Sequence, residues 1–438
     1  MKIKIKVKPY SEVIKIAPAS HKKPQPQSAA FRKLLSFLSA SELKRANFEY
    51  KSIGMDALPA DEPCLILMNH SSFIDLKIAA TILRDRPFHI ICTTDGFVGK
   101  SWLMRKLGCI PTRKFQTDVN LVRDMKYTLR DLKSSVLMFP EAGYSFDGTA
   151  TTLPDSLGKC LKYLDVPVVM IKTYGAFSRD PLYNNLKIRH VDVSAEVEYI
   201  LSRDDIKNRT PEELFGVIEE KFTFDSFKWQ QEHNIRIDEP FRADYLNRVL
   251  YKCPHCYSEG SMLGSGDTIT CKKCGRAYRL TEYGYLEAVS GEPAFTHIPD
   301  WFNWERGEVR DELISGKYHM TLSVDIYILI NTKCLYKVGN GTLTHDKSGF
   351  YLNGCNGELE YRQKPGVSYT LNSDYYWYEI GDVICIGTGS VLYYCFPQGE
   401  GDVVAKARLA TEELYKLIRK GVILQDGTEV KNTETRHI

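Results

Sequence analysis

The stretch CLILMNHSSFIDLKIAATIL, residues 64–83, decides the fold of the first half of the chain. It begins with the apolar run CLILM, which is typical of a buried strand, and it ends with LKIAATIL, which has the length and composition of a helix. His70 and Asp75 lie between them, at the strand end and in the opening turn of the helix. A strand, a loop and a helix in this order indicate an α/β layer structure, in which function collects at the carboxyl ends of the strands.

The same alternation continues from about residue 60 to 200. Short apolar runs (FHIIC, SVLMFP, VPVVMI) alternate with helix-like stretches such as NLVRDMKYTLRDLKS. We therefore expect an α/β domain over residues 48–245, with a mostly parallel sheet flanked by helices.

The length and the charge distribution suggest that the chain holds more than this one domain. A chain of 438 residues exceeds what one hydrophobic core usually serves, and 43% apolar with 26% charged residues is ordinary for folded proteins. The net charge of +3 hides a basic arm, because residues 1–51 carry 12 Lys and Arg against three Glu. Such an arm is attracted to anionic lipid or nucleic acid, or it is a solvated tail.

Residues 1–47 are expected to hold this basic arm and an amphipathic helix. Apolar side chains recur there at helical spacing, at Phe31, Leu34, Leu35, Leu38, Leu43 and Ala46. The helix could lie in a membrane interface or dock on the following domain. The sequence has neither a run of about 18 apolar residues nor a secretory signal, so we expect a cytoplasmic protein, peripheral at the inner face of the membrane.

Two CxxC pairs open the second half of the chain. Cys253 and Cys256 are followed after 14 residues by Cys271 and Cys274, the spacing of a four-thiolate zinc knuckle. We predict a zinc ribbon over residues 246–290 with structural zinc. His255 is interpreted as a surface residue, and the ribbon as a folding staple or protein platform rather than a nucleic-acid contact.

Closely spaced strand patterns follow a Trp-rich connector at residues 291–315. They predict an all-β, pleckstrin-homology-like domain over residues 316–438, closed by the helix DVVAKARLATEELYKLIRKG. Such a domain binds lipids, peptides or nothing, so the fold assigns it no function.

The chemistry of the first domain rests on His70 and Asp75. An imidazole oriented by a carboxylate is suited to take a proton from a hydroxyl near neutral pH. Alone, the pair is also explained by a loop histidine and an acid favoured at a helix start. The surrounding sequence decides between these two interpretations of the pair.

Asn69-His70-x-x-x-x-Asp75 after a buried strand resembles the signature of the glycerol-phosphate and lysophosphatidate (1-acylglycerol-3-phosphate) acyltransferase family. GCIPTR, ending at Arg113, resembles its second block, FPEAGYS, residues 139–145, its third, and VPVV, residues 166–169, its fourth. The resemblance covers about residues 48 to 200. In the third block Ala142 replaces Gly and Gly143-Tyr144 replaces Thr-Arg, which leaves recognition of a phosphomonoester acceptor without one arginine.

The resemblance implies direct acyl transfer in phospholipid synthesis, from acyl-CoA or acyl carrier protein to a lysolipid hydroxyl, with His70 as base and Asp75 as its partner. It implies substrate-binding roles for Asn69, Arg113, Glu141 and Gly143. Lys100 belongs to a basic cluster around Arg113 that either holds phosphates or forms a solvated surface. The alternative is a non-catalytic acyltransferase-fold scaffold, whose ribbon and β-domain bind nucleic acid or protein partners.

Overall fold

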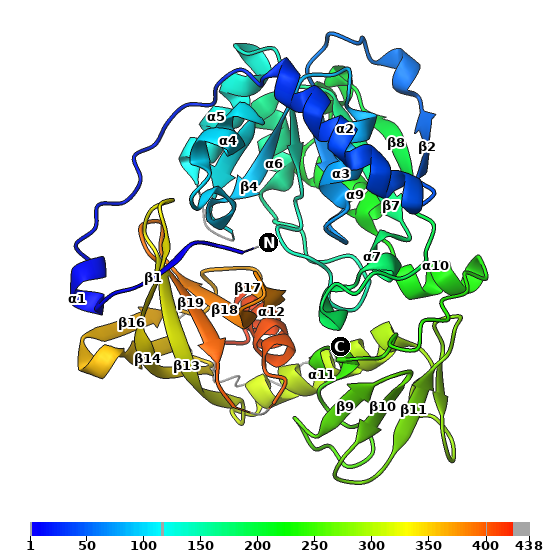
Figure 1. Cartoon of the computed structure of the whole chain (residues 1–438), viewed down its shortest axis with the longest axis vertical. Coiled ribbons are helices and arrows are strands. Elements are labelled where there is room, and N and C mark those ends of the chain that lie inside the picture. Colours follow the sequence, from blue (N-terminus) through cyan, green and yellow to red (C-terminus); the bar gives the residue numbers. More distant parts are fainter. Residues whose placement is uncertain (1, 115–117, 400, 424–438) are drawn as a thin grey trace.

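A seven-stranded sheet forms the first half of the molecule in the computed structural model, which describes residues 2–114, 118–399 and 401–423 (Figure 1). Its strand order is β2-β8-β7-β3-β6-β4-β5, and neighbouring strands are parallel except for β7 and β8. This confirms the predicted mostly parallel sheet. The strands are β2 (Glu49–Ile53), β3 (Leu65–Met68), β4 (Phe88–Thr93), β5 (Cys109–Thr112), β6 (Ser135–Met138), β7 (Val168–Tyr174) and β8 (Ser194–Leu201).

Strand β3 lies in the middle of this sheet, and all four of its side chains are buried. Ile66 and Met68 belong to a core cluster on one face of the sheet, and Leu65 and Leu67 to a cluster on the other. Successive side chains of a strand point to opposite faces, so the run LILM must be apolar throughout once helices cover both faces.

Helices surround the sheet. Their bounds are α2 (Ala29–Arg45), α3 (Asp75–Ile82), α4 (Ser101–Lys106), α5 (Val119–Arg130), α6 (Leu157–Leu164), α7 (Ala176–Arg179), α8 (Arg203–Asn208), α9 (Pro211–Phe222) and α10 (Ser226–Glu232). We call residues 29–232 the α/β region. Helix α2 packs on α3, and it buries Leu43 while Leu34 and Leu38 of the predicted apolar stripe stay exposed.

A four-stranded antiparallel sheet follows, in the order β12-β11-β10-β9. Its strands are β9 (Met262–Ser265), β10 (Thr268–Cys271), β11 (Ala277–Leu280) and β12 (Leu286–Ala288). We call residues 251–288 the ribbon. Helix α11 (Ile298–Ile314) leads away from it, and the fully buried Trp301 of α11 donates its indole N–H to the carbonyl of Lys252.

An antiparallel sheet with the order β16-β15-β14-β13-β19-β18-β17 forms the last part, which we call the β-region (residues 319–423). Its elements are β13 (His319–Leu329), β14 (Leu335–Asp346), β15 (Gly349–Gly354), β16 (Leu359–Gln363), β17 (Asn372–Trp377), β18 (Gly381–Gly387), β19 (Leu392–Pro397) and α12 (Val404–Arg419). The predicted all-β architecture is present, while its likeness to pleckstrin-homology domains stays a prediction. Ribbon, α11 and β-region share one continuous hydrophobic core, and α11 packs on α12.

The basic arm crosses the molecule from the β-region to the α/β region (Figure 1). Its strand β1 (Ile5–Val7) pairs in parallel with β14, and the short helix α1 (Tyr10–Val13) buries Val13 in the core shared with the ribbon. Further along, His21 lies 2.9 Å from the carboxylate of Asp124 on α5. No helix among the described residues is both long and apolar enough to span a membrane.

Candidate active site and metal centre

His70 and Asp75 meet where β3 ends and α3 begins. The Nδ1 atom of His70 lies 3.1 Å from Oδ2 of Asp75, which is 1% exposed. The same carboxylate oxygen accepts the backbone N–H groups of Ser71 at 2.9 Å and Ser72 at 3.0 Å. Backbone N–H groups at a helix start favour a carboxylate there, so the fold itself fixes the group that orients the imidazole.

The surroundings keep the His70 imidazole neutral. Burial lowers the pKa of His70 below its usual value, and the hydrogen bond and charge of Asp75 oppose this effect. The contact with Asp75 assigns the proton of the neutral ring to Nδ1. Nε2 then carries the lone pair that can accept a proton from a hydroxyl group.

Two aromatic rings enclose the imidazole. The ring centroids of Phe139 and Tyr144 lie 4.1 Å and 3.9 Å from that of His70, and Phe73 stacks on Tyr144 at 5.2 Å. Tyr144 stands where the resembling family has arginine, so a ring takes the place of a charge. Ala142, before it, has a φ of 53°, a left-handed conformation that marks a tightly constrained loop.

Glu141 is bonded on both sides to the backbone around the catalytic loop. One oxygen accepts the N–H of His70 at 2.8 Å, and the other accepts the N–H of Thr151 at 2.8 Å and its hydroxyl at 3.2 Å. Glu141 is 3% exposed, and burial raises its pKa to about 7. These hydrogen bonds tie the carboxylate to the protein backbone, where it fixes the position of His70.

Asn69 is held in a comparable way. Its amide oxygen accepts the N–H and hydroxyl of Thr173 on β7, at 2.8 Å and 3.1 Å, and its NH₂ donates to Ser71 and to the carbonyl of Thr173. The side chain therefore ties the catalytic loop to the neighbouring strand.

A second buried acid supports the start of α3. Ser72 donates its hydroxyl to Asp180, which also contacts Arg179 at 3.3 Å. Burial raises the pKa of Asp180 to about 7. No sequence pattern pointed to this residue, which follows α7.

The predicted basic residues lie farther along the same edge of the sheet. Arg113 follows β5, three strands from β3, so a strand spacing of about 4.8 Å puts their ends about 14 Å apart. Arg113 is half-buried, and burial lowers its pKa. Lys100 immediately precedes α4, and Gly143 is buried in the third block. Lys114 lies close enough to His70 for its charge to lower the pKa of the imidazole.

The β-region contacts this edge of the sheet through several residues. Arg408 of α12 donates to the carbonyl of Tyr144 at 3.0 Å. Tyr378, after β17, donates its hydroxyl to Asp95 at 3.1 Å. The turn before β14 meets the start of α4, where Ser101 donates to the hydroxyl of Thr332 at 2.7 Å. No sequence pattern indicated that the last part of the chain contacts the loops around His70.

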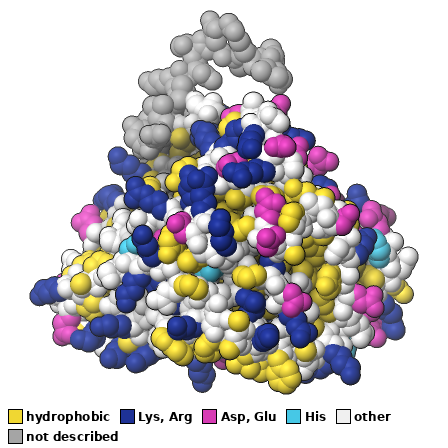
Figure 2. Space-filling model, turned by 90° about the horizontal axis from the view of Figure 1, so that it is seen from above, with side chains coloured by type: hydrophobic (Ala, Val, Ile, Leu, Met, Phe, Trp, Pro, Cys, Tyr) yellow, Lys and Arg dark blue, Asp and Glu magenta, His cyan; other side chains and the backbone are white. Residues whose placement is uncertain are grey.

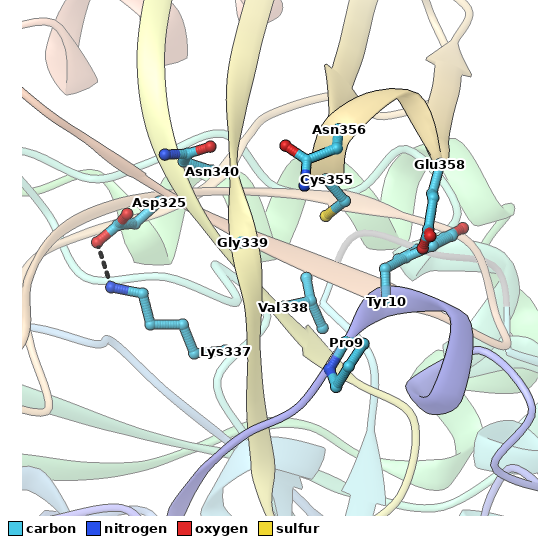
Figure 3. A pocket seen from close by; sticks show the side chains of 10 residues that line it. All are labelled: Pro9, Tyr10, Asp325, Lys337, Val338, Gly339, Asn340, Cys355, Asn356 and Glu358. Atoms are coloured by element: carbon cyan, nitrogen blue, oxygen red, sulfur yellow. Dashed lines mark hydrogen bonds and ion pairs between the residues drawn. The ribbon is translucent and has the colours of Figure 1, made fainter.

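A cavity of about 330 Å³ lies elsewhere, against the β-region (Figure 3). It is bounded by Pro9 and Tyr10 of the basic arm and by residues of β13, β14 and the loop at Cys355. Lys337 and Asp325 form an ion pair at 2.7 Å in its wall. Its lining includes none of the residues around His70.

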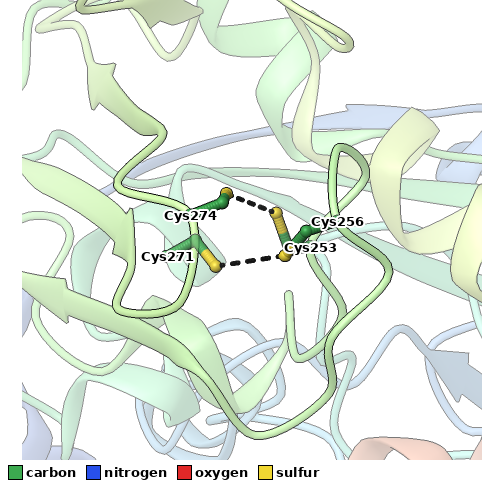
Figure 4. A group of neighbouring side chains, drawn as sticks. All are labelled: Cys253, Cys256, Cys271 and Cys274. Carbon is green, nitrogen blue, oxygen red and sulfur yellow. Dashed lines mark hydrogen bonds between the residues drawn. The ribbon is translucent and has the colours of Figure 1, made fainter.

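The four predicted cysteines converge at one end of the ribbon (Figure 4). All four sulfurs lie within 4.8 Å of one another, and the Cys253–Cys274 and Cys256–Cys271 pairs are each 3.7 Å apart. A tetrahedral zinc ion with Zn–S bonds of about 2.3 Å needs sulfurs about 3.8 Å apart, so this donor set fits zinc. His255 turns to the hydroxyl of Tyr278, 2.8 Å away, outside the thiolate set.

The fold and the site together define a class of protein. Its members have a largely parallel α/β sheet and an oriented His–Asp pair at the carboxyl end of the central strand. Residues 49–172 match the family model Acyltransferase, and this segment is an acyltransferase-family domain. The predicted family resemblance is thereby confirmed.

The structure of the 1-acyl-sn-glycerophosphate (LPA) acyltransferase PlsC from Thermotoga maritima is similar with a TM-score of 0.33 and 16% identity, covering 44% of this chain and 78% of that chain. No curated protein matches the chain.

Proposed function

We propose that the chain transfers a fatty acyl group from acyl-CoA or acyl carrier protein to the hydroxyl of a lysolipid in phospholipid synthesis. The observation that carries the proposal is the 3.1 Å contact between His70 Nδ1 and the buried carboxylate of Asp75. This contact occupies Nδ1 and leaves Nε2 free to act as the base. His70 lies in the loop that resembles the first block of the acyltransferase family.

In the proposed reaction, Nε2 of His70 takes the proton of the acceptor hydroxyl as the oxygen attacks the thioester carbonyl. Asp75 stabilises the resulting imidazolium through the Nδ1 hydrogen bond. The C–S bond breaks, and the thiolate leaves with the proton that His70 returns. The acyl group ends as an ester on the acceptor, and no covalent enzyme intermediate forms.

Glu141 and Asn69 would act by holding the backbone of His70 in place, since their hydrogen bonds are with the protein. Arg113 and Lys100, at the far end of the sheet edge, suit the phosphates of coenzyme A or of the carrier-protein arm. Gly143 would allow substrate to approach the backbone of the third block.

Zinc would have a structural role. Four thiolates complete a tetrahedral shell and leave no open position for catalysis. The ion would fix the ribbon, which shares its core with α11 and the β-region.

We further propose peripheral association with the inner face of the membrane. Leu34, Phe37 and Leu38 expose 48%, 77% and 62% of their surface on α2, and Trp102 exposes 66% on α4. Phe31 contacts Trp102, which joins the two helices. Figure 2 shows Lys and Arg side chains, with some Asp and Glu, spread among groups of hydrophobic ones on the face seen from above. The Lys and Arg side chains and the hydrophobic groups suit an anionic lipid surface.

The test is transfer of a labelled acyl group from acyl-CoA and from acyl carrier protein to a panel of lysolipids, with the His70→Ala variant beside the wild type. Product that requires His70 supports the proposal and identifies donor and acceptor. Equal product from both proteins would remove His70 from the mechanism. No product with any pair would favour the scaffold alternative.

A further inference from the structure

The end of the third block lies between His70 and the β-region. The ring of Tyr144 lies on the imidazole of His70, and Ser145 donates its backbone N–H to the carbonyl of His70 at 3.4 Å. Phe146, the next residue, packs into the core shared with the β-region, where its ring stacks on Tyr375 of β17 with a centroid distance of 4.3 Å. A group that holds this short segment therefore also sets the ring against which the imidazole packs.

The guanidinium of Arg408, on α12, contacts this segment on two sides. It donates to the carbonyl of Tyr144 at 3.0 Å, and it lies 4.4 Å from the centroid of the Phe146 ring. Arg408 is 5% exposed, so little water competes for these contacts, and both are stronger than they would be at a surface. The third block has tyrosine where the resembling family has arginine, and here a guanidinium reaches the backbone of that tyrosine from a distant helix.

A buried carboxylate keeps the guanidinium of Arg408 in this orientation. Glu412, one turn further along α12, accepts from Nε of Arg408 at 3.2 Å and is 3% exposed. It also accepts from Arg306 of α11 at 2.7 Å and from the hydroxyl of Thr370 at 2.6 Å. Burial opposes the ionisation of Glu412, but the charges of Arg306 and Arg408 lower its pKa to about 2. The carboxylate is therefore charged at neutral pH, and α11 and α12 hold Arg408 against the third block.

We propose that Arg408 is a positioning residue for acyl transfer, which holds the backbone of Tyr144 from α12 and so keeps the tyrosine ring on His70. The inference rests on the proposed function and makes the β-region an intramolecular partner of the acyltransferase domain. The ring limits the movement of the imidazole, so that Nε2 keeps one direction toward the acceptor hydroxyl. Arg408 itself acts from behind the loop, through Tyr144, and takes no part in the proton transfer.

The kinetic test compares Arg408→Gln with the matched control Lys406→Gln. Lys406 is a cation of the same helix, but it pairs with Glu259 of the ribbon at 2.7 Å and with Glu312 of α11 at 2.8 Å. We expect Arg408→Gln to lower kcat for acyl transfer about 30-fold, with KM for the lysolipid within about threefold of the wild type, because a displaced base slows the chemical step. Lys406→Gln should leave kcat within about threefold, although Tm falls in both variants.

Arg408→Lys is the conservative variant. It keeps a positive charge beside Glu412 and a donor on the side of Tyr144, but it loses the planar fork. Its kcat should lie between those of the wild type and Arg408→Gln. Equal falls in kcat for Arg408→Gln and Lys406→Gln, or a loss confined to KM, would overturn the proposal.

NMR of protein with 13C-labelled histidine separates this inference from the reaction itself. The Tyr144 ring, with its centroid 3.9 Å from that of the His70 ring, shields the carbon-bound protons of the imidazole. The resonance that disappears in His70→Ala should therefore move downfield in Arg408→Gln and, to a smaller extent, in Arg408→Lys. In Lys406→Gln it should stay in place.

This readout does not depend on acyl transfer. A His70 resonance that stays in place in folded Arg408→Gln, or in Arg408→Lys if the first variant does not fold, would overturn the proposal. A shifted resonance together with no transfer by the wild type would reject only the proposed reaction, and the contact that positions the Tyr144 ring would stand.

Discussion

The four cysteines of the candidate metal centre come from one stretch, residues 253–274, whereas the residues around His70 come from segments far apart in the chain. The fold of the ribbon alone brings the four cysteines together. His70 needs β3, the third block, β7 and the β-region, because Asp75, Glu141, Asn69 and Tyr144 each depend on a different contact. The cysteine cluster is thus locally determined, and the His70 site is assembled by the whole fold.

Asp75→Asn should separate the chemistry of the His70 site from the cysteine cluster. The amide keeps its size and can still accept from Ser71 and Ser72, but it cannot stabilise an imidazolium by charge. We expect kcat for acyl transfer to fall by about 10³-fold, with little change in Tm and full zinc content. Asp85→Asn, an exposed residue, is the control. A loss below about threefold would mean that the pair does not act as base and partner.

Cys271→Ser should change zinc content and stability, the two properties that Asp75→Asn should leave nearly unchanged. Removing one thiolate opens the tetrahedral shell, so zinc should be lost, and the free energy of unfolding should fall by several kcal/mol as the shared core loosens. Metal analysis and thermal unfolding measure both effects. Cys160→Ser, outside the cluster, should change neither. A Cys271→Ser protein that keeps its zinc would contradict the structural role.

Glu141, which accepts the backbone N–H of His70, should make the stability of the fold depend on pH. Its folded pKa of about 7 lies above the usual value of 4.5, so between these pH values the folded state holds a proton that the unfolded state has released. The contribution of Glu141 to the free energy of unfolding is therefore fully present below about pH 4.5. About 3 kcal/mol of it is lost as pH rises to about 7.

Glu141→Gln removes this titration, and chemical denaturation at several pH values should show a shallower fall over that range. The variant should also be less stable at pH 5, because its NH₂ faces a backbone N–H. An unchanged slope would show that Glu141 does not carry the effect.

The smallest expected effect concerns membranes. The double variant Phe37→Ser and Leu38→Ser should weaken co-sedimentation with vesicles containing anionic lipid by several-fold, because these side chains are exposed on α2. Val367→Ser, a 61% exposed residue of the β-region, is the control. Equal retention of both variants would remove α2 from the proposed membrane contact.

Features encoded by a short stretch of sequence could be predicted, and features that depend on distant contacts could not. The acyltransferase segment and its central strand followed from apolar runs and four short blocks, and the cysteine centre from spacing alone, because each pattern is local. The pairing of β1 with β14 was missed, since Lys alternating with Ile or Val described a basic arm equally well. Arg408 carried no signal, because nothing in a helix pattern encodes which distant loop the helix will face.

The most direct test of the account is the single-turnover rate of acyl transfer by wild type and His70→Ala, with bound zinc and Tm measured on the same preparations. We expect the rate to fall by about 10³-fold or more, with zinc content and Tm unchanged, because His70 supplies the base and does not hold the fold together. Rates within about twofold of each other would contradict it.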